Sequence, residues 1–386
     1  MLSIVSLLSA TTVGYSEEYE EGISLDSASA VVEMEEEEKI LLNSELKWQP
    51  EVLARLEEFI LANGKNAPTF DPAKPPVAIF DWDNTIIKND IGDLAFAWML
   101  KNDKILQPES GDWRKICPHL SSEAVLSLAS ACGGTEAGKP IKTSTNTACA
   151  DELLSIYSQG KTLNGKVAFK EINDNWLEPS YALAAFVFKG YKPDEVHGFA
   201  KLAIKEALDA PVGATQMIGS GEYNAYVRVY DEMKDLVRVL KEYGFDVWIV
   251  SASTQYVVET FAAQIGMSKD RVIGIRSEIG EDGKILSVLK PCGPSKPGES
   301  NLMTYRDGKR CWINKVIFEN DGPHADKPAA DLNLRPVFSA GDSDTDVSFM
   351  LDATGLKLVI DRGSKELMSY ARSNIDGKWL VHPMFM

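Results

Sequence analysis

The sequence lacks the features of several large classes of protein. Its 386 residues hold no uninterrupted apolar run of about 18, so we expect no integral membrane segment. The net charge of −17 argues against nucleic acid as a partner, because nucleic-acid phosphates demand a basic surface. Five cysteines are few, and odd in number, for a disulfide-held scaffold. What is present is an ordinary globular composition, 44% hydrophobic and 25% charged, which can form a sizeable core.

The acidic charge is concentrated at the start of the chain. Residues 1–47 contain eleven Asp or Glu and only two Lys, which is typical of a solvated, disordered lead-in. Residues 1–14 are apolar but have no Lys or Arg before them. They fit either the remnant of a signal peptide or a disordered tail, and we favour export, periplasmic or extracellular, over the cytoplasm.

Beyond residue 47 the pattern alternates between strands and helices. A helix begins at Pro50 and is ended by Gly64, and further helices are expected at 230–243, 256–265, 347–351 and 365–372. Short apolar runs predict buried strands at 77–80, 247–250, 337–340 and 356–360. This order predicts an α/β fold with a Rossmann-like parallel sheet covered by helices on both faces.

The first two strands are separated by about 150 residues, far more than a crossover connection needs. Helical patterns recur there at 94–100, 122–131 and 194–208. We therefore expect a mostly helical cap domain at 89–224, inserted into a catalytic core formed by 48–88 and 225–386.

Three of the expected strands end in polar clusters. They run into Asp81-Trp82-Asp83-Asn84-Thr85, Ser251-Ala252-Ser253 and Gly341-Asp342-Ser343-Asp344-Thr345-Asp346. Ligands of open α/β sheets bind at the carboxyl ends of the strands, so these clusters should meet in one crevice. Crowded carboxylates need a cation, and their hard oxygens favour Mg²⁺ shared with a substrate phosphate. An aspartate can also serve as a nucleophile and form an aspartyl-phosphate.

These clusters resemble the motifs of the haloacid dehalogenase-like (HAD) superfamily, in its phosphatase branch. Asp81-x-Asp83-x-Thr85 resembles the first motif, Ser251 the second, Lys309 the third, and Gly341-Asp342 with Asp346 the fourth. The first motif alone is weak evidence, but all four occur in the right order, each at an expected strand end or helix start. Lys315 remains an alternative to Lys309, because the spacing from Lys309 to Asp342 requires an extra loop around 320–333.

The resemblance implies a role for each residue. Asp81 would attack phosphorus, and Asp83 would protonate the leaving oxygen and later activate water. Ser251 and Lys309 would stabilise the phosphoryl group, and Thr85 would fix the motif loop beside the substrate. Mg²⁺ would be held by Asp81, the backbone carbonyl of Asp83 and Asp342, with Asp346 behind them.

A large cap implies a small, soluble phosphomonoester, because a protein could not reach beneath it. Asp90 lies where phosphoserine phosphatases, which resemble this chain, carry a glutamate that contacts the substrate amine, and Asp93 is a second candidate. The alternative is that either residue merely caps a helix starting near Leu94. A negative charge there favours phosphocholine, phosphoethanolamine or phosphoserine, and the chain resembles phosphorylcholine phosphatases about equally.

Other functions stay open on the sequence alone. A phosphotransferase or a mutase would use the same scaffold, and a non-catalytic ligand-binding protein would be expected to have lost one of the motif residues. Two further expectations concern side chains near the site. Ser253 is assigned to the start of the helix at 256–265 as its cap, and Cys292 and Cys311 are the expected disulfide in an exported protein.

Overall fold

The structure, a computed structural model, describes residues 41–385. The segment 1–14 and most of the acidic lead-in therefore lie outside the described residues. Residues 41–47, which the sequence assigns to that lead-in, pack against the fold. Leu42 is only 4% exposed, and the backbone N–H groups of Asn43 and Lys47 donate to Asp235 and Glu232 at 2.7 and 3.0 Å. Packing thus begins before Trp48. None of the helices in the described part combines the length and hydropathy needed to cross a membrane.

The centre of the fold is a six-stranded sheet in the order β12-β11-β10-β1-β6-β7. All its neighbouring strands pair in parallel, which confirms the expected fold class. Its strands are β1 (Val77–Phe80), β6 (Asp246–Thr254), β7 (Val272–Ile275), β10 (Phe338–Gly341), β11 (Leu356–Asp361) and β12 (Trp379–Pro383). Because β1 lies between β10 and β6, the segments that follow these three strands emerge side by side at one edge.

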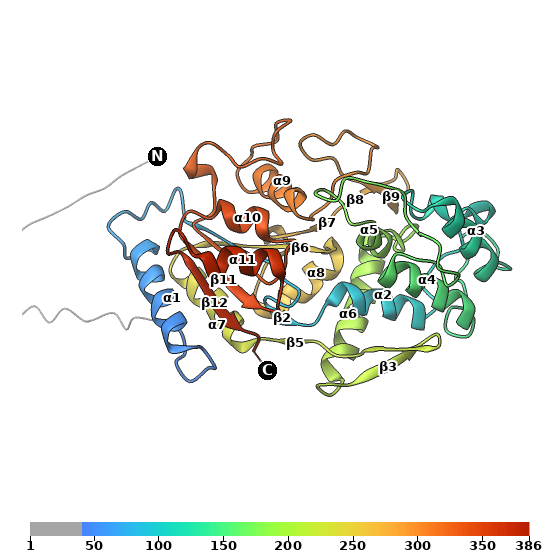
Figure 1. Ribbon diagram of the computed structural model, residues 1–386, viewed down its shortest axis with the longest axis horizontal. Helices are drawn as coiled ribbons and strands as arrows, with labels where there is room; N and C mark the ends of the chain where they lie inside the picture. Colours follow the sequence, from blue (N-terminus) through green and yellow to red (C-terminus); the bar gives the residue numbers. More distant parts are fainter. Residues whose placement is uncertain (1–40, 386) are drawn as a thin grey trace, which may run out of the picture. The chain divides into compact units, whose positions relative to one another are not determined.

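Helices cover both faces of the sheet (Figure 1). Apolar residues of α1 (Pro50–Asn63), α7 (Asp231–Glu242) and α8 (Gln255–Ala262) form one buried cluster together with Phe80. Those of α9 (Asp307–Val316), α10 (Val347–Asp352) and α11 (Lys365–Ser373) form another cluster with Ile79. Successive residues of a strand point to opposite faces, so β1 contributes to both clusters.

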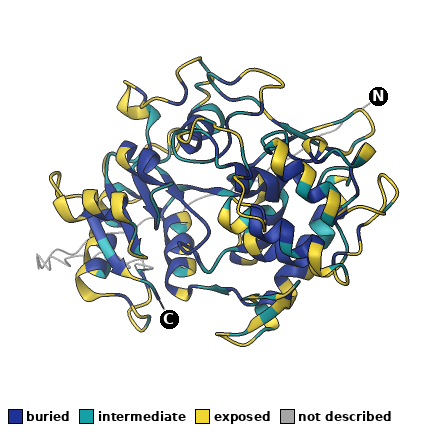
Figure 2. Ribbon diagram, turned by 45° about the vertical axis from the view of Figure 1, so that its right-hand side comes forward, coloured by how far each residue is buried: buried dark blue, intermediate teal, exposed yellow. Residues whose placement is uncertain are grey.

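The segment between β1 and β6 is mostly helical, as expected. It contains α2 (Ile91–Lys101), α3 (Ser122–Ala131), α4 (Thr147–Gln159), α5 (Pro179–Phe186) and α6 (Pro193–Asp209), then the hairpin of β3 (Thr215–Ile218) and β4 (Gly221–Asn224). The short strands β2 (Ile87–Lys88) and β5 (Arg228–Val229) pair antiparallel where this segment leaves and rejoins the chain around the sheet. Figure 2 shows buried residues continuing from the sheet into these helices, and the division into cap and core stays a prediction.

Two disulfides are present. Cys292–Cys311 ties the loop after the hairpin of β8 (Ser277–Ile279) and β9 (Ile285–Leu289) to α9. This is the pair expected from the sequence. Cys132–Cys149, which the sequence analysis did not pair, ties the end of α3 to α4, and Cys117 is free and buried.

Candidate active site

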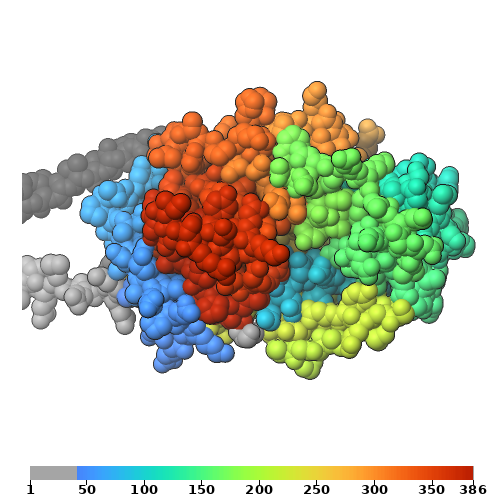
Figure 3. Space-filling model, viewed as in Figure 1, coloured from blue at the N-terminus to red at the C-terminus, as the bar shows by residue number. Residues whose placement is uncertain are grey.

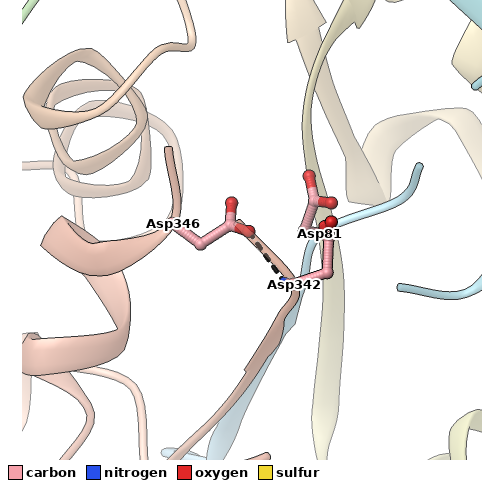
Figure 4. A group of neighbouring side chains, drawn as sticks. All are labelled: Asp81, Asp342 and Asp346. Carbon is pink, nitrogen blue, oxygen red and sulfur yellow. Dashed lines mark hydrogen bonds between the residues drawn. The ribbon is translucent and has the colours of Figure 1, made fainter. Parts of the chain in front are cut away.

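Three aspartates gather at the carboxyl edge of the sheet. Asp81 follows β1, Asp342 follows β10, and Asp346 precedes α10. Each offers a carboxylate oxygen, and these oxygens lie within 4.8 Å of one another. In Figure 4 the carboxylates of Asp81 and Asp342 lie next to each other, and Asp346 reaches toward Asp342 from the opposite side. The backbone N–H of Asp342 donates to Asp346 Oδ2 at 3.1 Å, which fixes the turn between β10 and α10.

Lys309, in the first turn of α9, neutralises part of this charge. Its Nζ donates to Asp81 Oδ1 and to Asp346 Oδ1, both at 2.6 Å, and the residue is 1% exposed. Burial lowers the pKa of Lys309, but the carboxylates of Asp346 and Asp81 raise it by more, so the ammonium stays charged. Lys315, the alternative lysine, lies away from the cluster and pairs with Asp321 at 2.9 Å.

Asp83 has quite different neighbours from Asp81. Its Oδ1 accepts from the backbone N–H of Ile91 at 2.7 Å, and its Oδ2 accepts from the hydroxyls of Ser253 at 2.8 Å and Ser251 at 3.2 Å. Burial, together with the charge of Asp81, raises the pKa of Asp83 to about 7. A carboxyl group with that pKa can carry a proton at neutral pH and also give it up, as an acid–base catalyst must.

The loop that carries both aspartates closes tightly on itself. Asn84 has φ 60°, a left-handed conformation that asparagine tolerates better than most residues. Its side-chain oxygen accepts from the backbone N–H of Asn89 at 3.1 Å. Thr85 donates toward Asp81 Oδ2 at 3.2 Å and Asp342 Oδ1 at 3.1 Å, so this one hydroxyl bridges the ends of β1 and β10.

The donor set of the cluster fits a hard divalent cation. Burial is the main cause that raises the pKa of Asp342 well above its usual range, and the charges of Asp81 and Asp346 add to it. Its Oδ2 is buried and accepts no hydrogen bond from the described residues. Nε of Arg362 lies 3.0 Å from that oxygen, an ion pair without hydrogen-bond geometry. Carboxylate oxygens left in this state are the ligands that Mg²⁺ prefers.

Comparison with known proteins agrees with this geometry. The family model for haloacid dehalogenase-like hydrolases matches residues 165–351, a range that contains Ser251, Lys309, Asp342 and Asp346 but not Asp81. Over this range the chain is similar to the haloacid dehalogenase-like hydrolases.

The chain was also compared with solved structures. A conserved protein of unknown function from Anaerococcus prevotii has a TM-score of 0.66 at 22% identity, over 88% of this chain and 93% of its own. A protein of unknown function from Bordetella pertussis has a TM-score of 0.46 at 13% identity, over 80% of this chain and 98% of its own. A probable phosphoserine phosphatase from Vibrio cholerae has a TM-score of 0.40 at 13% identity, over 82% of this chain and 62% of its own. The first likeness shows a shared fold, and no curated protein matched the sequence.

Two adjoining cavities lie beside the aspartates. The first, about 90 Å³, is lined by Asp81, Asp83, Lys309 and Asp342 among others. The second, about 370 Å³, lies over α2 and α4 and contains none of these four residues. Asn84, Asp90, Tyr157, Tyr181 and Arg362 line both cavities, so the two cavities adjoin at these residues.

Asp90 and Asp93 lie at the start of α2. Asp90 is the N-cap of this helix, and its Oδ1 accepts from the backbone N–H of Asp93 at 3.0 Å, as the alternative interpretation held. Both residues nevertheless line the second cavity, where the Tyr157 hydroxyl donates to Asp93. Capping and a role in the cavity are therefore compatible.

Three side chains depart from the sequence analysis. Ser253 does not cap α8, because β6 continues through it to Thr254, and its hydroxyl instead binds Asp83 and lines the first cavity. Ser251, expected at the phosphoryl group, donates to Asp83 and is not among the residues that line either cavity in the described part. Arg362 was missed, although it directly follows β11, at the same sheet edge as the other strand ends.

Proposed function

We propose that this protein is a Mg²⁺-dependent phosphomonoesterase that uses Asp81 as its nucleophile and acts on a small, amine-bearing substrate. The observation that carries the proposal is the contrast between two neighbouring carboxylates. Asp81 is held by Lys309 and Thr85 in the metal-binding cluster, and Asp83 sits apart with a pKa of about 7. One is placed to attack, and the other to transfer protons.

The residues of the chain divide the first step among them. A carboxylate oxygen of Asp81 forms a bond to phosphorus while the bond from phosphorus to the ester oxygen breaks. The leaving oxygen takes the proton of Asp83, and Lys309 offsets the negative charge of the phosphoryl oxygens. The hydroxyls of Ser251 and Ser253 hold the Asp83 carboxyl in position.

The second step returns the enzyme to its starting state. Asp83, now ionised, takes a proton from water, whose oxygen attacks phosphorus. The bond from phosphorus to Asp81 breaks and inorganic phosphate leaves. Asp81, Asp342 and Asp346, with the carbonyl of Asp83, would hold Mg²⁺, which when bound offsets charge on the phosphoryl oxygens.

The second cavity supports an amine on the leaving group. Burial, and then the charges of Asp83 and Asp93, raise the pKa of Asp90 well above its usual range. Negative charge crowded in this way is relieved by a bound cation. Tyr157 and Tyr181 line the same cavity, and the face of an aromatic ring attracts an ammonium group.

A screen of phosphomonoesters with Mg²⁺ present tests the proposal directly. We expect release of inorganic phosphate from phosphoserine, phosphoethanolamine or phosphocholine at a higher kcat/KM than from sugar phosphates or nucleotides. The Asp81→Asn variant is the matched control for contaminating activity. Hydrolysis confined to sugar phosphates or nucleotides would refute the amine-bearing substrate and leave the phosphatase chemistry intact.

A further inference from the structure

Arg362 is a charged group of the site to which the mechanism assigns no role. It directly follows β11 and lines both cavities. Of the residues that line them in the described part, only Lys309 and Arg362 are basic. Lys309 is buried and already holds two carboxylates at 2.6 Å. Arg362 is therefore the basic side chain that remains available to the leaving group of a substrate.

The guanidinium of Arg362 is only partly engaged. Its ion pair with Asp342 runs through Nε, and its side chain is 46% exposed. Among residues 41–385, no hydrogen bond from any of its N–H groups is found, although a guanidinium has five donors in a planar fork. This fork matches the two oxygens of a carboxylate better than any single-point cation does.

The second cavity thus presents opposite charges to one small molecule. Asp90 and Asp93 contribute carboxyl groups from α2, which a bound ammonium group would hold in the ionised form, and Arg362 contributes a positive charge from the end of β11. The charge of Arg362 interacts with Asp90 as well as with Asp342. A substrate with ammonium alone satisfies the acidic side and leaves the arginine without a partner. A substrate with ammonium and carboxylate on one carbon satisfies both sides.

We propose that Arg362 is a specificity-determining residue that binds a carboxylate on the leaving group, so that the substrate class is an O-phosphorylated amino acid. The inference rests on the proposed function and narrows it, since phosphocholine and phosphoethanolamine carry no carboxylate. Arg362 acts on the part of the substrate that does not react, and its loss should spare the chemical step.

Phosphoserine and phosphoethanolamine form a matched pair of substrates, because they differ only in the carboxylate. We expect the wild type to prefer phosphoserine. Arg362→Gln should lower kcat/KM for phosphoserine by about 10- to 100-fold, the range for a charge-assisted hydrogen-bonded contact, mostly through KM. The same change should alter kcat/KM for phosphoethanolamine by less than about threefold. Arg362→Lys should recover part of the loss, because it restores the charge but not the fork.

A control variant and a binding measurement complete the test. Arg372→Gln removes an exposed arginine of α11 that lines neither cavity, and should leave both substrates unaffected. As a readout without turnover, L-serine should inhibit p-nitrophenyl phosphate hydrolysis more strongly than ethanolamine does, and Arg362→Gln should abolish the difference.

The outcomes separate this inference from the proposed function. Equal losses on both substrates in Arg362→Gln, or a wild-type preference for phosphoethanolamine or phosphocholine, would overturn the carboxylate contact while leaving an amine-phosphate phosphatase. A wild type that hydrolyses none of the amine phosphates better than sugar phosphates would overturn the proposed substrate and the inference with it.

Discussion

Asp81 and Asp83 stand two residues apart, and their surroundings give them different properties. Asp81 faces Lys309 and the other cluster aspartates, whereas Asp83 faces the hydroxyls of β6. A strand would point both side chains to the same face, and the turn at Asn84 follows at once. The chemistry of the pair is therefore set by the partner strands on either side of β1, not by the motif alone.

At this scale the first prediction concerns the nucleophile. Asp81→Asn should lower kcat by about a thousandfold or more, because the amide cannot attack phosphorus. The fold should persist, since Lys309 keeps Asp346 as a partner and one of three crowded carboxylates is removed. Initial rates with p-nitrophenyl phosphate measure the loss of kcat, and a thermal melt shows whether the fold persists. Activity within tenfold of the wild type would contradict the mechanism.

A second prediction follows from the raised pKa of Asp83. The folded state holds this proton up to about pH 7, whereas the unfolded chain releases it near pH 4. Between these values the folded state binds more protons, so the contribution of Asp83 to stability falls as pH rises. In a chelating buffer, Asp83→Asn should thus become steadily more stable relative to the wild type from pH 4 to pH 7. Melts at several pH values check this, and a constant difference would refute the assigned cause.

Most residues of the site could be proposed from the sequence, because polar residues that directly follow a short apolar run mark the end of a strand. The same reasoning applied to the end of β11 would have found Arg362. Ser253 was misassigned because the apolar run stops at Val250, while the register of β6 with β7 shifts between Val250 and Thr254 and extends the strand. Tyr157 was missed because the sequence analysis predicted no helix at α4, which follows a loop rich in Gly, Ser and Thr.

At the scale of elements, α9 positions Lys309, and Gly308 allows α9 to begin where it does. A Cβ at Gly308 would overlap the carbonyl oxygen of Met303, which is backbone and cannot move aside cheaply. Gly308→Ala should destabilise the protein by about 1–3 kcal/mol and lower kcat by displacing Lys309. Gly322→Ala, whose nearest atom would lie at 4.0 Å, is the matched control. Equal effects of the two changes would show that Gly308 does not position the lysine.

The disulfide Cys292–Cys311 anchors the same helix two residues beyond Lys309. With Cys132–Cys149 also formed, denatured and unreduced protein should show one free thiol, that of Cys117. Cys292→Ser with Cys311→Ser should cost roughly 3 kcal/mol of stability, as expected for a closed loop of this length. Titration with a thiol reagent counts the free thiols, and a count of five would mean that neither disulfide forms in the protein as produced.

Elements were predicted best where apolar runs are unbroken, as at Val77–Phe80 and Leu356–Asp361. Two strands of the central sheet, β7 and β12, were not predicted, and both have irregular sequences. Val272–Ile275 contains Gly274, where a Cβ would come within 2.7 Å of the backbone of β6, and Trp379–Pro383 contains a histidine and a proline. Tertiary packing supplies what the local pattern of these two strands lacks.

At the scale of the whole molecule, the active site lies where separate parts of the chain meet. Figure 3 shows the C-terminal part of the chain, in red, beside the part coloured green, which contains α4 and α5. The cavity residues come from both: Asp342 and Arg362 from the first, and Tyr157 and Tyr181 from the second. The sequence indicates which residues have the chemistry, but the cavities adjoin only because segments as far apart as Tyr157 and Arg362, more than two hundred residues, pack together.

The last prediction tests the aspartate cluster through the stability of the whole protein. A ligand that binds only the folded state stabilises it by mass action, by about 2.7 kcal/mol at a hundredfold excess over its Kd. Mg²⁺ should therefore raise Tm relative to the chelated protein. Asp342→Asn should raise Tm of the chelated protein, because it relieves the repulsion within the cluster, and should remove the response to Mg²⁺. Asp344→Asn is the control in the same loop. Asp344 accepts from the backbone N–H groups of Glu366 and Leu367, both at 3.0 Å, and does not belong to the cluster. Loss of the Asp344 carboxylate should lower Tm with and without Mg²⁺, while the rise in Tm caused by Mg²⁺ should stay the same. An Mg²⁺ increment that survives in Asp342→Asn would place the cation elsewhere and remove the basis for the proposed metal site.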